Sequence, residues 1–199
     1  MDPVALKVLM ISSDRSIAIP HSAVSERMKE YGELVGELHI VLLCDKVHMS
    51  SLKIKNSELK ISNNVWVYPT NSAVSFLRPW DASKMGKKLV YEKHFVRGQS
   101  VITTDSIECG WAGMKIKNKW RLPLEVQIHN DPFSPYFSGF QNGVRKYFAR
   151  KVLRRADAIR CVSRAVAEKI GERVGKEKVF VLPICLQLFQ RRGSTSTLQ

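Results

Sequence analysis

Short apolar runs alternate with longer stretches of helical periodicity along almost the whole chain, and this alternation limits the folds it can adopt. Several of the short runs are nearly continuous Val, Ile and Leu, which is typical of parallel strands covered on both faces. The expected strands are residues 5–11, 37–43, 65–68, 101–104, 124–129, 158–162 and 179–182. Strands that alternate with helices predict an α/β fold built on a doubly wound parallel sheet of about seven strands.

The segments between these strands carry apolar residues at helical spacing. The expected helices are residues 22–35, 83–97, 108–119, 143–155 and 164–174. Ser22 and Ser163 are suitable N-cap residues, and Gly175 is a suitable stop for the last helix. Residues 46–64 are polar and weakly patterned, so we expect a connection there that contains a short helix or ribbon.

The 199-residue chain is strongly basic, with a formal net charge of +14. Such a charge favours anionic partners, namely nucleic acid, acidic lipid or phosphorylated small molecules. No segment approaches the length of a transmembrane helix and the N-terminal apolar stretch lacks a cleavage site, so we expect a cytoplasmic protein. The four cysteines lie far apart, which favours buried thiols in a reducing compartment and gives no sign of a metal site.

In open parallel sheets, ligands bind at the carboxyl ends of the strands, near the point where the strand order reverses. Five of the expected strands end in small polar, acidic or histidine residues, which favours a binding site at this edge. These residues are Ser12, Ser13, Asp14, Arg15, Thr70, Asn71, Ser72, Thr103, Thr104, Asp105, Ser106, Glu108, His129, Asn130, Asp131 and Ser163. The chain has no G-x-G-x-x-G after its first strand, no P-loop and no G-x-S-x-G elbow, which disfavours dinucleotide dehydrogenases, P-loop NTPases and α/β-hydrolases.

The start of the chain, with KVLMISSDR, SAVSERMKEYG and ELHIVLL, resembles that of retaining GT-B glycosyltransferases of the family-4 type. Two later stretches are more specific matches: VITTDSIECGWAGMKIKNKWRLPLEVQIHNDPFSPYF and RKYFARKVLRRADAIRCVSRAVAEKI. The resemblance covers about residues 5–184. It implies a Rossmann-like domain that forms one half of a GT-B fold, the half that chiefly binds the acceptor.

The resemblance also implies roles for individual residues. His129 matches the strand-end histidine that lies near the transferred sugar, and we take it as the candidate catalytic residue. The candidate residues for binding the acceptor or lining the cleft are Asp14, Arg15, Asp105, Glu108, Asn130 and Ser163. Three positions depart from the family pattern: the segment from Asp105 to Glu108 lacks the Pro-Phe of D-P-F-E, Asn130 stands where relatives often have Thr, and Pro20-His21 stands where they tend to have Gly.

Some of these residues also have simple structural interpretations. His129 could be a histidine at the edge of the core that bonds to a neighbouring loop, and Asp131, which precedes a proline, favours a turn. The aromatics that follow favour packing of a loop onto the body over a shelf for sugar stacking; they are Phe133, Tyr136, Phe137 and Phe140.

The domain organisation follows from the same resemblance. We expect residues 1–185 to form the Rossmann-like domain and residues 186–199 to be a disordered tail, with the donor-binding domain of the family absent. The full-length enzyme would transfer a sugar from a nucleotide-sugar to a glycan or lipid-linked acceptor, without a cofactor or metal. The chain alone is expected to be inactive.

A basic stripe marks the expected helix over residues 143–155. Lys146, Arg150 and Arg154 recur at i, i+4 and i+8, and Val144, Tyr147, Phe148 and Val152 are expected to form the opposing apolar face. The stripe is either a solvated outer face or a contact to anionic lipid at the inner membrane face. A second basic set, Lys84, Lys87, Lys88, Lys93 and Arg97, is a weaker candidate because Glu92 interrupts it.

An alternative function remains open from the residues alone. A basic Rossmann-like module could bind anionic lipid or nucleic acid without catalysis. Nucleic acid is the less favoured partner, because the sequence contains no recognised RNA- or DNA-binding motif.

Overall fold

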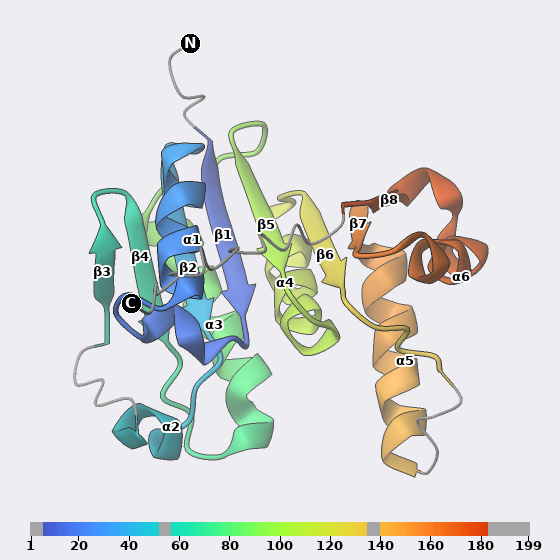
Figure 1. The fold of residues 1–199 in the computed structure, drawn as a ribbon, viewed down its shortest axis with the longest axis horizontal. Helices are drawn as coiled ribbons and strands as arrows, with labels where there is room; N and C mark the ends of the chain where they lie inside the picture. Colours follow the sequence, from blue (N-terminus) through green and yellow to red (C-terminus); the bar gives the residue numbers. More distant parts are fainter. Residues whose placement is uncertain (1–5, 52–56, 135–139, 183–199) are drawn as a thin grey trace, which may run out of the picture.

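An eight-stranded, mostly parallel sheet forms the centre of the computed structural model, which describes residues 6–51, 57–134 and 140–182 (Figure 1). The strand order is β3-β4-β2-β1-β5-β6-β7-β8. The strands are β1 (Lys7–Ser12), β2 (Glu37–Leu42), β3 (Leu59–Ser62), β4 (Val65–Pro69), β5 (Ser100–Thr104), β6 (Leu124–Ile128), β7 (Ala158–Cys161) and β8 (Val179–Val181). The predicted doubly wound α/β sheet is confirmed, with the reversal of strand order between β1 and β5.

Helices connect the strands as the alternating pattern predicts. They are α1 (Ala23–Glu33), α2 (Lys46–Ser51), α3 (Arg78–Glu92), α4 (Ile107–Trp120), α5 (Phe140–Arg155) and α6 (Arg164–Val174), with short 3₁₀ helices η1 (Arg15–Ala18), η2 (Ser75–Leu77) and η3 (Lys176–Lys178). Ser22, Ser106 and Ser163 each cap the helix that follows by accepting a backbone N–H. These caps fix the starts of α1, α4 and α6 directly after the loops at the carboxyl edge.

The sheet has eight strands where about seven were expected, because β3 pairs antiparallel with β4 at the sheet edge. The connection expected over residues 46–64, with a short helix or ribbon, contains α2 and β3. One prediction about the bounds of a helix was wrong. The helix expected over residues 83–97 begins at Arg78 and ends at Glu92. Its early start is possible because Pro79 lies in the first turn, where its missing N–H has no intrahelical partner to lose. Two residues after the helix ends, the backbone of His94 is left-handed, with φ of 53°.

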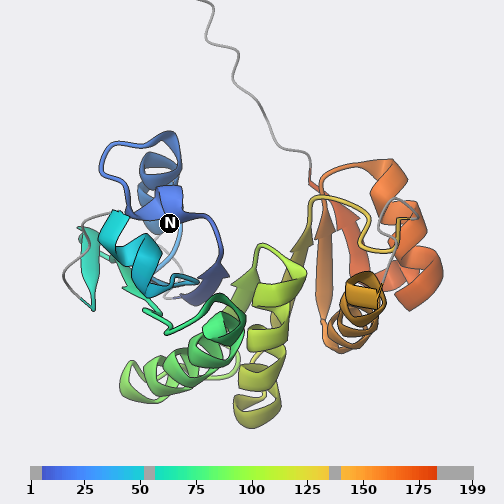
Figure 2. The ribbon, with the colours of Figure 1, turned by 90° about the horizontal axis from the view of Figure 1, so that it is seen from below.

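The two faces of the sheet are covered differently (Figure 2). Helix α1 covers one face, where Val8 and Met10 of β1 join a buried cluster with residues of β2 and β4. Helices α3, α4 and α5 cover the other face, where Leu9 and Ile11 of the same strand join a larger core cluster. The alternation along β1 thus divides its side chains between two hydrophobic cores.

On the α1 side, β5, β6 and β7 carry half-buried polar side chains. Thr103, Gln127 and Arg160 lie on this face, and Gln127 Nε2 donates to Thr103 Oγ1 at 3.2 Å. The neighbouring positions Ile102, Val126 and Ile159 are fully buried on the opposite face. These three strands are therefore amphipathic, unlike β1 and β2.

Three of the four cysteines, Cys44, Cys109 and Cys161, are buried free thiols, as predicted. Cys185, Tyr136, Phe137 and the expected tail over residues 186–199 lie outside the described residues. Among the helices that the structure describes, none is both long enough and apolar enough to cross a lipid bilayer.

Candidate functional site

The carboxyl edge of the sheet brings together the ends of β1 and β5, where the strand order reverses. The Ser12 hydroxyl donates to Asp105 Oδ2 at 2.5 Å, and the Ser13 backbone N–H donates to the same oxygen at 2.9 Å. The Asp14 backbone N–H in turn donates to Ser12 Oγ at 3.1 Å. Asp105 therefore fixes the start of the loop after β1 from the neighbouring strand.

Asp14 and Arg15 follow this anchored segment and are both exposed. The Asp14 carboxylate accepts the Ser16 N–H at 3.0 Å and so caps η1. The Ser22 hydroxyl donates to the Ser16 carbonyl at 2.6 Å, which ties η1 to the start of α1. The loop is held at both ends, and Arg15 is presented to solvent between them.

His129 and Asn130 lie at the same edge, directly after β6, and both are exposed. Strand β6 ends one residue earlier than expected, at Ile128, so His129 belongs to the bend and not to the strand. His129 is an exposed residue, which leaves it accessible to a ligand and disfavours the interpretation of a histidine at the edge of the core.

Asp131 shapes the turn after His129. Its Oδ1 accepts the Phe133 N–H at 2.8 Å, which is the local bond expected of an Asp before a turn. Phe133 is buried, and the Arg173 guanidinium lies 4.7 Å from its ring centroid. Among the aromatics of this segment, Phe133 packs the loop onto α6.

The two other predicted site residues lie at starts of helices. Glu108 is exposed in the first turn of α4, and Ser163 accepts the Val166 N–H at 3.4 Å as the cap of α6. The carboxyl edge thus brings Asp14, Arg15 and Asp105 together through bonded segments. His129, Asn130, Glu108 and Ser163 lie along the same edge, outside this bonded group.

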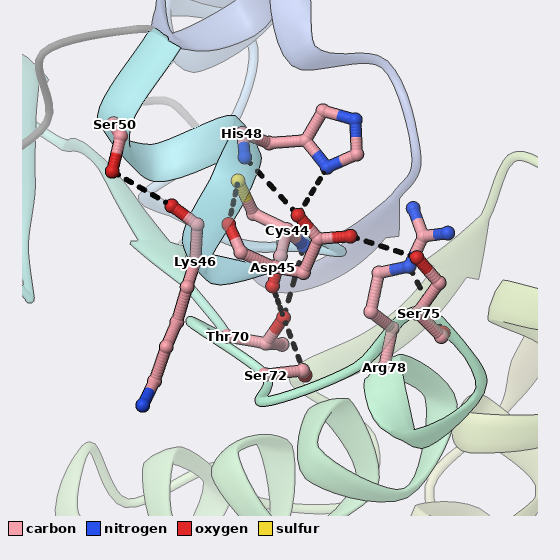
Figure 3. A network of polar contacts seen from close by, with 9 residues as sticks. All are labelled: Cys44, Asp45, Lys46, His48, Ser50, Thr70, Ser72, Ser75 and Arg78. Carbon is pink, nitrogen blue, oxygen red and sulfur yellow. Dashed lines mark hydrogen bonds and ion pairs between the residues drawn. The ribbon is translucent and has the colours of Figure 1, made fainter.

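A polar network at the end of β2 was missed from the sequence (Figure 3). Asp45 is 5% exposed, and its Oδ1 pairs with His48 Nδ1 at 2.5 Å while its Oδ2 accepts the Ser75 hydroxyl at 2.8 Å. The His48 backbone N–H and the Ser75 hydroxyl hold the pKa of Asp45 down at about 2. Because serine and histidine both bind the carboxylate, the histidine does not activate the serine as in a nucleophilic triad.

The same network joins the loops after β2 and β4. The Thr70 hydroxyl donates to the Cys44 carbonyl at 2.7 Å and accepts the Cys44 N–H at 2.9 Å, and the Ser72 hydroxyl donates to Thr70 Oγ1 at 3.3 Å. The sequence signal was an aspartate directly after a buried strand with a histidine three residues later, in CDKVH. Its partner Ser75 is too distant in the chain to be paired by inspection.

The predicted stripe on α5 is only partly as expected. Arg150 and Arg154 are exposed, whereas Lys146 is half-buried. The predicted apolar face was wrong in part, because Val144 and Tyr147 are 43% and 60% exposed. The first half of α5 extends past the carboxyl ends of β6 and β7, so the sheet cannot cover these side chains (Figure 1). Over residues 143–155 of α5, the buried residues are Ala149, Val152 and Leu153.

At the opposite edge of the sheet, where the strands begin, a basic side chain holds neighbouring elements together. Lys117 Nζ lies 2.5 Å from Asp157 Oδ2 and donates to the Arg155 carbonyl at 2.8 Å. Asp157 also accepts the Leu124 N–H at 2.8 Å. These contacts close the ends of α4, β6 and α5 against one another. Within the described ranges, no group of three or more His, Cys, Asp or Glu side chains is placed to hold a metal ion.

Comparisons with known proteins identify a family for this chain and solved structures with the same fold. A family model described as a glycosyl transferase 4-like domain matches residues 65–185. This range begins with β4 and includes β5, β6, β7 and β8, together with Asp105, Glu108, His129, Asn130 and Ser163. No curated protein matches the chain by sequence.

Solved structures share the fold at low sequence identity. Sucrose-phosphate synthase from Thermosynechococcus elongatus has a TM-score of 0.67 at 11% identity, covering 89% of this chain and 48% of that one. The HepE protein of Anabaena, solved in complex with UDP and glucose, has a TM-score of 0.58 at 15% identity, covering 89% of this chain and 44% of that one. UDP-N-acetylglucosamine 2-epimerase from Rickettsia bellii has a TM-score of 0.60 at 9% identity, covering 89% and 44%. The chain spans less than half the length of these proteins.

Proposed function

Because the chain belongs to the glycosyl transferase 4-like domain family, we propose that it supplies the acceptor-side half of a two-domain GT-B sugar transferase. The observation that carries this proposal is the bonded pair Ser12 and Asp105 at the point where strand order reverses. Open α/β sheets bind ligands at that point, and a fixed loop is what a positioned substrate requires. The sheet alone does not distinguish a sugar transferase from other enzymes, because a UDP-N-acetylglucosamine 2-epimerase shares the fold. The family match favours sugar transfer.

We assign the donor to a nucleotide-linked sugar, bound by a second domain that faces this edge. The HepE protein, which shares the fold, was solved with UDP and glucose, and this supports a UDP-linked sugar. No cofactor or metal is assigned to the reaction. In this arrangement the chain contributes the acceptor wall of the cleft, and the 199 residues alone would not transfer sugar.

Within that wall, His129 is the proposed catalytic residue. His129 is exposed and follows β6 at the carboxyl edge, where its ring nitrogen can accept a hydrogen bond from a sugar hydroxyl as positive charge develops at the transferred carbon. The exposed residues Asp14, Arg15, Glu108 and Asn130 are proposed to contact the acceptor, with Asp105 and Ser163 positioning the loops.

The acceptor is proposed to be a glycan or a lipid-linked sugar. A lipid-linked acceptor would require a cytoplasmic protein that attaches peripherally to the inner face of a membrane. On α5, Arg150 and Arg154 are exposed and Lys146 is half-buried, so this stripe is one surface that could make such a contact.

Saturation-transfer NMR on the purified 199-residue chain tests the acceptor role. Monosaccharides and disaccharides are expected to give contacts that His129→Ala removes. His94→Ala is the matched control, because His94 is also exposed but lies at the amino edge of the sheet. Sugar contacts that survive His129→Ala, or their complete absence, would reject the proposed site.

A second assay tests whether sugar transfer requires the second, donor-binding domain. The chain is incubated with labelled UDP-glucose and the saccharides that it contacts, and transfer is expected to be absent. Transfer by the chain alone would contradict the assignment of the donor to a second domain. If the chain contacts no sugar but binds acidic vesicles, the alternative of a non-catalytic anion-binding module is favoured.

A further inference from the structure

Helices α3 and α4 lie side by side on the face of the sheet opposite α1 (Figure 2). An aromatic pair lies at each end of the seam between them. Trp80 and Trp111 have ring centroids 4.4 Å apart at the end near the carboxyl edge. Tyr91 and Trp120 have centroids 6.3 Å apart at the other end. The two members of each pair come from different helices, so the aromatics span the seam.

Lysines fill the seam between these pairs. Lys84 and Lys88 are four residues apart on α3, Lys115 and Lys119 are four residues apart on α4, and all four are exposed. The Lys115 ammonium lies 5.2 Å from the Trp111 ring centroid, and the Lys119 ammonium lies 5.4 Å from that of Trp120. We define the α3–α4 seam as Trp80, Lys84, Lys88, Tyr91, Trp111, Lys115, Lys119 and Trp120.

The close approach of the two helices makes this seam a continuous surface. A Cβ at Gly86 would lie 2.4 Å from Ile116 Cδ1, so a larger residue there would require the Ile116 side chain to shift. The burial of Ile116 and Leu89 directs the lysines outward. The packing of these buried residues therefore fixes the positions of the side chains in the seam.

The charge of the seam is positive after its acidic neighbours are included. Helices α3 and α4 carry seven basic residues against three acidic ones, Asp81, Glu92 and Glu108. Lys84 lies 4.0 Å from Asp81 and Lys88 lies 3.7 Å from Glu92, both as exposed pairs on one helix. Such pairs are weak and leave the lysines able to exchange partners.

We propose that the α3–α4 seam docks onto the surface of an anionic lipid bilayer. Trp and Tyr favour the headgroup level because they have an apolar body and a polar tip, and lysines beside them contact acidic headgroups. Trp80 is 48% exposed and Tyr91 70% exposed, so both can enter that layer. Trp111 and Trp120 are half-buried and the Trp120 Nε1 is buried, so these two rings support Trp80 and Tyr91 from beneath. This docking would lay the outer sides of α3 and α4 along the membrane surface, with an aromatic pair at each end of the contact.

Two other partners fit the seam less well. A second copy of the chain would bring the lysines of one seam against those of the other. Nucleic acid would require aromatic faces open for stacking, whereas the rings of each pair pack against each other. The inference does not depend on the proposed sugar transfer.

Vesicle co-sedimentation with the 199-residue chain tests the docking. Vesicles of phosphatidylcholine alone are compared with vesicles that also contain phosphatidylglycerol, and binding is expected only to the latter. The seam variant replaces Lys84, Lys88, Lys115 and Lys119 with Gln and is expected to lower binding by about a thousandfold, at roughly 1 kcal/mol for each lysine. A charge-matched control replaces four exposed basic residues elsewhere with Gln, namely Arg27, Arg164, Lys169 and Lys176, and is expected to bind nearly as well as the wild type.

Three outcomes would overturn the docking of the seam. They are no binding to acidic vesicles, an equal loss in the seam variant and the control, and a loss confined to a variant with Lys146, Arg150 and Arg154 replaced by Gln. The last outcome would assign the membrane contact to α5. Circular dichroism spectra of all variants should match that of the wild type, so that a loss is not due to unfolding.

Tryptophan fluorescence locates the contact independently of the substitutions. Three of the four tryptophans, Trp80, Trp111 and Trp120, belong to the seam, whereas Trp66 stacks on His39 within the sheet. Acidic vesicles that contain brominated lipid are expected to quench the wild-type emission. Binding without quenching would contradict docking through the seam.

Discussion

The carboxylate of Asp105 accepts the hydroxyl of Ser12 across the two strands that flank the reversal of strand order, at 2.5 Å. The same carboxylate also accepts the N–H of Ser13, so one side chain orders the first residues of the loop after β1. Any ligand that enters the carboxyl edge between β1 and β5 would meet a loop whose position is already fixed.

Asp105→Asn is expected to lower the free energy of unfolding by about 1–3 kcal/mol. The amide that replaces one oxygen would direct its own N–H groups toward donors and leave them unsatisfied. Urea denaturation at neutral pH measures the change. Glu108→Gln, at an exposed position three residues later, is the control and is expected to stay within about 0.5 kcal/mol of the wild type. Equal stability of both variants would show that the contact between Ser12 and Asp105 is energetically neutral.

Acid is expected to weaken the network around Asp45. Its pKa is lowered from 3.8 to about 2 by the bonds from the His48 backbone and Ser75, so its carboxylate stabilises the fold above pH 4. This contribution is lost as the pH falls from about 4 through 2. Asp45→Asn should be less stable than the wild type at neutral pH, and the difference should disappear below pH 2. Thermal unfolding across this range measures it, and a constant difference would contradict the assignment.

A second pH effect is expected from His39, whose exposed fraction is 1%. Burial lowers the pKa of His39, partly opposed by its bond to Glu37, so the folded state favours the neutral imidazole. The unfolded chain then binds the proton more readily, and stability is expected to fall as the pH drops below the ordinary histidine value of about 6.5. His39→Gln should flatten the pH dependence of the melting temperature between about pH 7 and 5. If the melting temperature of the variant depends on pH as steeply as that of the wild type, protonation of His39 does not cause this pH effect.

Close packing beneath α4 is expected to make Gly113 intolerant of a side chain. A Cβ there would lie 2.8 Å from Leu124 Cδ1 and 3.0 Å from Thr104 Cγ2, so Gly113→Ala should cost about 1–3 kcal/mol in urea denaturation. Gly143 provides a matched control, because it also lies in a helix but a Cβ would have no neighbour within 4 Å. Gly143→Ala should be neutral or stabilising by up to about 1 kcal/mol. A loss of similar size in both variants would contradict the packing argument.

Much of the fold was predictable because buried parallel strands have a simple pattern. Strands β1 and β2 are nearly continuous apolar runs, and they lie where the sequence places them. Strand β3 was expected only as a possible ribbon within residues 46–64, because the residues of Leu59–Ser62 are half-buried or exposed at the sheet edge and no apolar run marks them. The start of α3 was misplaced because Pro79 interrupts the helical pattern although it fits the first turn.

The candidate site was predictable only as a set of strand ends. The sequence places Asp14, Asp105 and His129 at carboxyl ends, but it does not state which of them touch. Ser12 and Asp105 are 93 residues apart in the chain, and Asp45 and Ser75 are 30 apart. Such contacts depend on strand order and register, which local patterns do not specify. The aromatic pairs between α3 and α4 could not be predicted for the same reason, since each pair joins residues of different helices.

The polar side chains on one face of β5, β6 and β7 have a consequence for local stability. Around β1 and β2 the sheet has a hydrophobic core on each side, whereas at β6 and β7 the core lies on one side only. At the end of the sheet, Phe180 and Val181 of β8 are 43% and 37% exposed. Local stability should therefore be graded across the width of the sheet, so that backbone amides of β8 exchange their hydrogens fastest and those of β1 and β2 most slowly.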